Sequence, residues 1–122
     1  MSARTLGAVS QGLLAAHERF NAWATVWGAA PTLKESHNVT SVTKDATGDY
    51  TVTFGAAFAA SAYAVVIGCT RIDTAAVSGI GGNIRTTSLP AVGSVALRFT
   101  QLGTVSTLLD PTYFTVACVG NV

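Results

Sequence analysis

The stretch Lys44-Asp45-Ala46-Thr47-Gly48-Asp49-Tyr50-Thr51-Val52-Thr53-Phe54 decides the fold class. Its first six residues are polar or small and include a glycine, which is typical of a hairpin turn. In the rest, large apolar residues alternate with threonines, so a strand would place the two kinds on opposite faces. The pattern therefore predicts an antiparallel hairpin with one face in a core and the other in water.

Alternation of this kind recurs on both sides of the hairpin. We expect further strands in residues 22–27, 32–36, 38–43, 63–70, 94–100 and 112–119, separated by turn signals such as Pro90 with Gly93 and Asp110-Pro111. Val39 and Val42 are out of phase, which a bend or bulge between them would explain. Residues 63–70 are apolar on both faces, as in a strand covered on both sides. Six or more short strands predict an all-β fold, an antiparallel β-sandwich of jelly-roll-like type.

The first twenty residues follow a different period. Apolar residues recur there at intervals of three and four, which favours a short helix, although two glycines weaken it. We expect residues 1–20 to form an arm, helix or anchor, and residues 21–122 to form one β-sandwich domain. The residues that would contact another protein through this arm are Leu6, Val9, Leu13 and Phe20.

The composition indicates a surface that is short of charge. Only 11% of the 122 residues are charged, against roughly 25% in typical globular domains. A chain of this size exposes most of its surface, so we expect part of its exterior to be buried against other subunits. The net charge is +1, and the basic and acidic residues are scattered along the chain, which argues against nucleic-acid binding. No apolar run is long enough for a membrane span.

No constellation of residues predicts catalysis, a cofactor or a metal. His17 and His37 have no partners at metal-ligand spacing, and Glu35 shares a strand face with His37 by geometry alone. Cys69 and Cys118 lie in apolar runs, so either two buried thiols or a disulfide between neighbouring strands fits them. We therefore expect the chain not to be an enzyme.

Three further motifs have simple interpretations. The run Gly79-Ile80-Gly81-Gly82 is interpreted as a loop or bulge, because a β-like run and not a helix follows it. The sequon Asn38-Val39-Thr40 is interpreted as incidental. Trp23 and Trp27 share a strand face, which suits packing in a core or a subunit interface, or alternatively stacking on a sugar.

Several segments resemble the C-terminal modules of bacteriophage tail fibres and related virion proteins. They are Asn38-Val39-Thr40-Ser41-Val42-Thr43, Thr47-Gly48-Asp49-Tyr50-Thr51-Val52-Thr53-Phe54 and Ala62-Tyr63-Ala64-Val65-Val66. Flanking features are similar too, namely Phe20-Asn21-Ala22-Trp23 with a turn at Gly28, and Asp110-Pro111-Thr112-Tyr113 before the last strand. The resemblance spans residues 20–122.

The resemblance implies a trimeric β-sandwich on a phage particle, without catalytic residues. Because only about twenty residues precede the module, we expect a small virion protein, made in the bacterial cytoplasm, whose arm docks on other virion proteins. It would be a knob on the capsid, as a decoration or cement protein, or on the tail, as part of a fibre. The alternative is an adhesin that recognises a host surface glycan or protein. A carbohydrate-active enzyme fragment would need paired carboxylates, and the six acidic residues are too scattered to propose a pair.

Overall fold

The computed structural model describes residues 20–28, 30–70, 79–85, 89–101 and 107–121. All regular structure in these ranges is β, which confirms the predicted all-β class. The eight strands are β1 (Phe20–Trp27), β2 (Thr32–His37), β3 (Val39–Ala46), β4 (Asp49–Phe54), β5 (Ala64–Thr70), β6 (Ile80–Ile84), β7 (Ser94–Gln101) and β8 (Tyr113–Val119).

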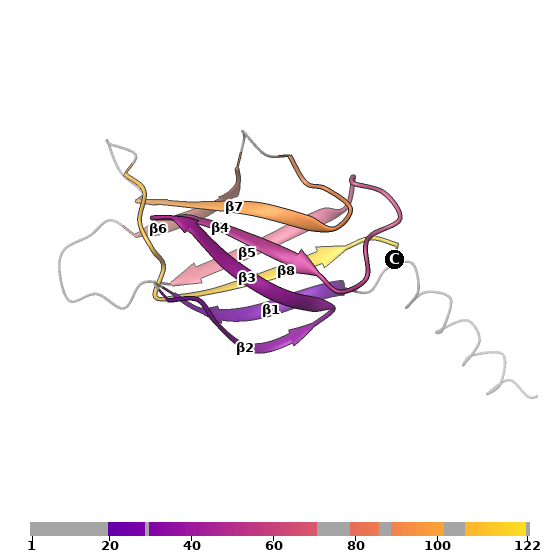
Figure 1. Cartoon of the computed structure of the whole chain (residues 1–122). Coiled ribbons are helices and arrows are strands. Elements are labelled where there is room, and N and C mark those ends of the chain that lie inside the picture. The colour runs from indigo at the N-terminus through magenta and orange to yellow at the C-terminus, as the bar shows by residue number, and fades with distance from the viewer. Residues whose placement is uncertain (1–19, 29, 71–78, 86–88, 102–106, 122) are drawn as a thin grey trace, which may run out of the picture.

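The strands form two four-stranded sheets, stacked as layers in Figure 1. Sheet A has the order β2-β1-β8-β5, and sheet B has the order β3-β4-β7-β6. Every pair of neighbouring strands is antiparallel. The predicted antiparallel β-sandwich is therefore confirmed. The first and last strands, β1 and β8, lie side by side in the middle of sheet A (Figure 1).

The predicted boundary of the N-terminal arm needs one change. Phe20 was assigned to the arm, but it is the first residue of β1 and pairs with Val119. Its side chain is 50% exposed. Leu6, Val9 and Leu13 lie outside the described residues, so their role as an anchor stays a prediction.

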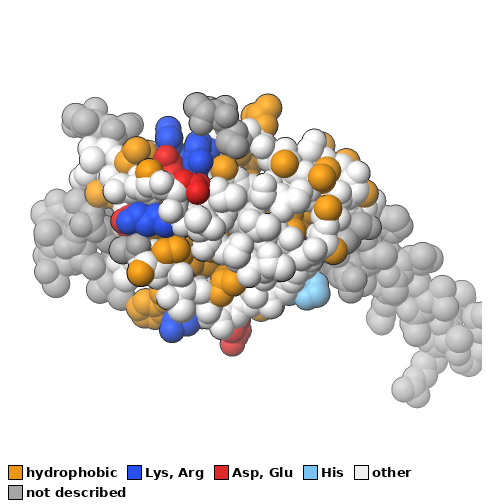
Figure 2. Space-filling view, viewed as in Figure 1, with side chains coloured by type: hydrophobic (Ala, Val, Ile, Leu, Met, Phe, Trp, Pro, Cys, Tyr) orange, Lys and Arg blue, Asp and Glu red, His pale blue; other side chains and the backbone are white. Residues whose placement is uncertain are grey.

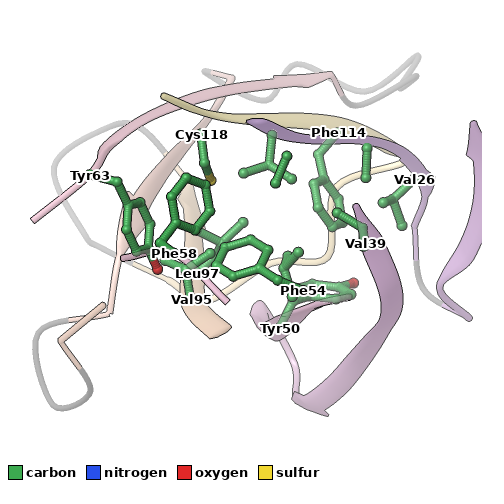
Figure 3. Packing of buried hydrophobic residues seen from close by; sticks show 14 of the residues in the cluster. Val26, Val39, Tyr50, Phe54, Phe58, Tyr63, Val95, Leu97, Phe114 and Cys118 are labelled. Carbon is green, nitrogen blue, oxygen red and sulfur yellow. The ribbon is translucent and has the colours of Figure 1, made fainter. Parts of the chain in front are cut away.

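The core lies between the sheets and follows the predicted alternation. The central strands contribute most of it, with Ala22, Ala24, Val26, Tyr50, Val52, Phe54, Val95, Leu97, Phe99, Phe114, Val116 and Cys118 all buried. Three aromatic rings meet at its centre, with centroids 5.6 Å apart for Tyr50 and Phe99 and 4.9 Å apart for Phe99 and Phe114. Figure 3 shows Tyr50 and Phe114 pointing into this space from opposite sheets. Burial of these side chains is the main stabilising contribution to the fold.

The chain bends at Asn38, between β2 and β3. This residue has a φ of 54°, the left-handed region that asparagine tolerates better than most residues. Its side-chain amide accepts a hydrogen bond from the Ala56 N–H and donates one to the Ala56 carbonyl. A bulge follows between Val39 and Ser41, which explains why Val39 and Val42 are out of phase. The asparagine of the sequon thus has a structural role.

Two predictions about strands were wrong. Residues 63–70 were expected to be covered on both faces, but β5 is an edge strand of sheet A, and Val66 is 57% exposed. Its other face, with Val65 and Ile67, packs against the core. The run Gly79–Gly82 was expected to be a loop or bulge, but residues 80–82 belong to β6, which pairs with β7 without a register shift. A Cβ on Gly82 would lie 2.6 Å from the Ile67 side chain, so a glycine is needed where the sheets approach each other.

A partly buried polar cluster joins three segments at one end of the sandwich. The Asp110 carboxylate accepts hydrogen bonds from Lys44 Nζ (2.6 Å), the Gly48 N–H (2.8 Å) and the Tyr50 hydroxyl (3.0 Å). The same hydroxyl lies 3.1 Å from the Gly28 carbonyl oxygen. Burial alone would raise the pKa of Asp110, but these three donors lower it overall. The cluster therefore fixes the ends of β1, β3 and β8 relative to one another.

The two cysteines are free thiols. Cys69 is paired across the ladder with Phe114, and Cys118 with Val65, which places the cysteines four residues apart along adjacent strands. That offset corresponds to about 13 Å, whereas a disulfide needs Cα atoms within roughly 7 Å. Of the two alternatives, separate thiols are therefore correct, with Cys118 buried and Cys69 partly buried.

Candidate functional site: the outer face of sheet A

The outward faces of the two sheets differ in chemistry. On sheet B, the Asp49 carboxylate accepts hydrogen bonds from Arg98 Nε (2.7 Å) and Nη2 (2.9 Å), and Arg85 Nε lies 3.6 Å away. Arg85 also pairs with Asp45 at 3.0 Å. The hydrogen bonds from Arg98 are the main cause of a lowered pKa at Asp49. Figure 2 shows acidic and basic side chains lying next to one another near one end of the visible surface.

Many of the other outward positions of sheet B carry small polar side chains. They alternate with the buried residues of β3, β4 and β7 and include Ser41, Thr43, Thr51, Thr53 and Ser94. Hydroxyl groups and balanced ion pairs are well solvated in water. This face has the character of an ordinary solvent-exposed surface.

The outer face of sheet A instead carries aromatic side chains and small side chains. We call it the aromatic face and define it by the outward residues of the four strands. They are Thr32, Lys34, Glu35 and His37 on β2, Trp23, Thr25 and Trp27 on β1, Tyr113, Thr115, Ala117 and Val119 on β8, and Ala64, Val66 and Gly68 on β5. Among these residues charge is confined to β2, so the central strands carry none.

The register places these residues in rows across the sheet. One row runs from His37 through Trp23 and Ala117 to Val66, and the next runs through Thr25, Thr115 and Gly68. The bulky side chains therefore stand on the two central strands, and small side chains occupy much of the β5 edge.

Trp27 is a large aromatic residue of the aromatic face with 45% of its surface exposed. The Tyr113 ring lies beside it, nearly perpendicular at 77°, with the centroids 6.0 Å apart. The Lys34 ammonium lies over the Trp27 ring, 5.7 Å from its centroid, which is within the range of a cation–π contact. The indole is thus held in place by neighbours from β8 and β2.

The structure tests one of the roles predicted for the two tryptophans, packing in the core. Packing in the core is wrong for Trp23 and Trp27, because Ala22, Ala24 and Val26 are the residues of β1 that face the core. Both tryptophans lie on the aromatic face, where a subunit interface or a sugar site stays a prediction. The sequence indicated that they share a face, but it did not indicate that Tyr113 would complete the group.

His37 and Glu35 share the outward side of β2, as their spacing predicted, and both are exposed. The Glu35 N–H donates to the Thr25 hydroxyl. Across the described residues, no three His, Cys, Asp or Glu side chains lie close enough together to hold a metal ion. No helix in the described part of the chain is long and apolar enough to cross a membrane.

A pocket of roughly 240 Å³ lies at the end of the sandwich where β8 finishes. It is lined by Ala59, Ala60, Ala62, Tyr63, Gly120 and Asn121. The Tyr63 hydroxyl is already used, since it bonds to the Ala91 and Ser94 carbonyls at 2.8 and 3.0 Å. Burial raises the pKa of this tyrosine to about 12. The pocket therefore offers methyl groups, the tyrosine ring, backbone atoms and one amide.

Comparisons with known proteins assign the chain to no family. No family model matches the chain, and neither the curated proteins nor the solved structures include a match. The aromatic face is consequently the feature from which a function is argued.

Proposed function

We propose that this chain is a non-enzymatic bacteriophage virion protein, a homotrimeric β-sandwich knob attached to the capsid or the tail. The observation that supports assembly is the aromatic face, whose central strands expose Trp27, Tyr113 and small residues and carry no charge. Four strands of about seven residues give a face of roughly 19 by 23 Å, or about 440 Å² in projection. The largest exposed patch on an ordinary monomer measures about 300–600 Å² and is often functional, so the character of this face, more than its size, supports an interaction site.

A structural role is also supported by the state of two largely covered acidic side chains, Asp49 on the outer face of sheet B and Asp110 at the end of the sandwich. Asp49 and Asp110 are each held by several donors, and their pKa values are lowered. A carboxylate held in this way contributes to stability and is a weak base at neutral pH. These groups therefore act as parts of the framework.

The assignment to a phage particle rests on the sequence resemblance over residues 20–122. Two of the segments that carry it, residues 38–43 and 47–54, form the β3–β4 hairpin, and a third begins β5. The capsid and the tail are both compatible with this resemblance.

The receptor-binding alternative has less support from the aromatic face. Sugars stack on open ring faces, but the Lys34 ammonium lies over the Trp27 ring and Tyr113 stands at its side. The exposed part of the Trp27 side chain is better suited to insertion between side chains of another protein. An adhesin of this fold would have to use other surfaces, such as loops at the ends of the sandwich.

The experiment that tests the proposal is a solution mass measurement on the full chain by light scattering. We expect three times the chain mass of 12.5 kDa, over a wide range of protein concentration. A mass of one chain at all concentrations would contradict the trimer. For the virion assignment, mass spectrometry of gradient-purified phage particles should detect the chain, and its absence from particles whose genome encodes it would contradict that part.

A further inference from the structure

We infer that the free edge of β5 binds an extended, uncharged segment of another protein, which adds to sheet A as a further antiparallel strand. This inference goes beyond the proposed function, because it names a surface and a kind of partner and does not require that the chain form a trimer. The backbone groups and side chains along this edge specify the partner.

The sandwich has four edge strands, and three of them carry features that keep other strands from pairing with them. β2 carries Lys34 and Glu35. β3 carries Lys44 and Asp45, and its pairing with β4 has two register shifts. β6 is only five residues long and contains two glycines. β5 has seven residues without a charge or a proline, and it pairs with β8 without a register shift. It is therefore the edge most open to another strand.

The register shows which backbone groups of β5 are free. At the end of the β1–β8 ladder, the Gly28 N–H donates to the Thr112 carbonyl oxygen. Every second residue of an antiparallel ladder bonds to the same neighbour, so even-numbered residues of β8 bond to β1 and odd-numbered ones to β5. The odd-numbered residues of β8 pair with even-numbered residues of β5. The N–H and C=O groups of Val65, Ile67 and Cys69 therefore point away from β8, and no described strand pairs with them there.

These free groups fit an extended peptide. Three alternate residues each offer one donor and one acceptor, and they repeat about every 6.8 Å along the strand. An extended backbone repeats its own N–H and C=O groups at the same distance, so it can bond to all three residues. Peptides that add to an open sheet edge bind through main-chain hydrogen bonds of this kind. Antiparallel pairing is slightly more stable per residue than parallel pairing, so we expect the segment to run antiparallel to β5.

The side chains on the open side of the sandwich between β5 and β6 are incompletely covered. Phe114 and Val116, on the neighbouring strand β8, are at most 2% exposed. By contrast, five apolar side chains of β5 and β6 pack against the core but are only partly buried, namely Val65, Ile67, Cys69, Ile80 and Ile84. A segment along β5 would place every second side chain over this gap. An apolar side chain there would be stabilised by burial, whereas a charged one would lose its hydration.

A separate segment fits this edge better than the β5 strand of a second copy. In a folded copy, β5 is already fixed in its own sheet and contacts β6, so it cannot lean into the gap. Contact between two folded copies would be limited to a strip of about 23 by 10 Å, or roughly 230 Å² in projection. A stable pair needs about 800 Å² from each partner. A segment without a sheet of its own can cover both the backbone edge and the exposed parts of the apolar side chains.

The test uses the full chain and a synthetic peptide of seven alternating valines and threonines, beginning and ending with valine, with one lysine added at each end for solubility. Amide hydrogen exchange followed by NMR reports on each residue of β5 separately. Without peptide, we expect fast exchange at Val65, Ile67 and Cys69, and slow exchange at Val66 and Gly68, whose N–H groups point toward β8. Peptide at ten times its Kd should slow the first three about tenfold and leave the amides of β2 unchanged.

Two N-methylated peptides are the matched controls. In the antiparallel arrangement, the valines that face the gap are also the residues whose N–H groups point at β5. Methylation of three valine amides should therefore weaken binding by at least about tenfold, since each loses a hydrogen bond. Methylation of the three threonine amides changes only the far edge of the peptide and should leave the Kd within about threefold.

Several outcomes would overturn the inference. One is a peptide that does not bind, or that slows exchange elsewhere than at Val65, Ile67 and Cys69. Another is an equal effect of the two methylated peptides. Slow exchange at these three residues without peptide, at every protein concentration, would mean that the chain covers its own edge. Slowing that increases with protein concentration would mean that a second copy occupies it. The solution mass tests the trimer separately, so failure of one proposal is distinguishable from failure of the other.

Discussion

Replacing Tyr50 by phenylalanine isolates the contribution of the polar cluster at the end of the sandwich. The substitution keeps the ring that packs against Phe99 and Phe114 and removes only the hydroxyl. That hydroxyl lies 3.0 Å from Asp110 Oδ1 and 3.1 Å from the Gly28 carbonyl oxygen. Its burial raises the pKa of Tyr50 above the ordinary value of a phenol, so the group is a neutral donor at every working pH.

The expected magnitude follows from these contacts. A hydrogen bond to a charged acceptor contributes about 1.5–3 kcal/mol, because the acceptor left behind stays desolvated. Asp110 keeps two other donors, Lys44 and Gly48, which moderates the loss. We therefore expect Tyr50→Phe to lower the free energy of unfolding by about 2 kcal/mol, a factor of roughly 30 in the ratio of unfolded to folded protein.

Urea unfolding at a fixed protein concentration measures this difference, since assembly would make the stability depend on concentration. The slope with urea should stay the same, and only the midpoint should fall. Tyr113→Phe is the control, because this side chain is outward and only partly buried, and it should change the stability by less than about 0.5 kcal/mol. An equally small effect of Tyr50→Phe would refute the role given to the cluster.

Three further outcomes are expected. Gly28→Ala should destabilise the fold by about 1–3 kcal/mol in the same urea assay, because its Cβ would lie 2.1 Å from a backbone carbonyl oxygen. The lowered pKa values of Asp49 and Asp110 mean that folding favours the ionised forms, so this stability is complete above the ordinary value of 3.8 and is lost as the pH falls through the folded values. Urea midpoints between neutral and acid pH should show a flatter fall for Asp49→Asn than for the wild type. Val66→Asp on the aromatic face should reduce the solution mass to one chain, while Thr53→Asp on sheet B should leave it unchanged.

Much of the fold could be predicted because its strands alternate strongly. The hairpin of β3 and β4 and the final strand were expected within a few residues of their observed bounds, and the buried side of each was correct. In these strands the pattern of side chains and the local turn residues agree. The bulge between Val39 and Ser41 was also predicted, because Val39 and Val42 are out of phase in the sequence.

The errors arose where tertiary contacts override local preference. Glycine favours loops, yet Gly81 and Gly82 lie in β6 because the close approach of Ile67 leaves no room for a larger residue at Gly82. The apolar outward face of β5 resembles that of a covered strand, and only the strand order shows that it is an edge.

The aromatic face could be predicted only in part, for a similar reason. Trp23 and Trp27 share a strand, so their spacing indicates a common face. Tyr113 and Val66 join them only because β8 and β5 are the next strands of sheet A, and nothing local to those strands specifies their neighbours.

The pairing of β1 with β8 also sets the order in which the molecule can be made. The four strands of sheet B all lie between residues 39 and 101, so they can leave the ribosome before β8 has been made. Sheet A cannot form completely until residues up to Val119 have emerged from the ribosome, because β8 lies between β1 and β5. Pairing of segments so distant in sequence is slow. Until β8 has paired with β1, the sheet that carries Trp23 and Trp27 is incomplete. The outer face of sheet A is therefore the last large surface of the described sandwich to form.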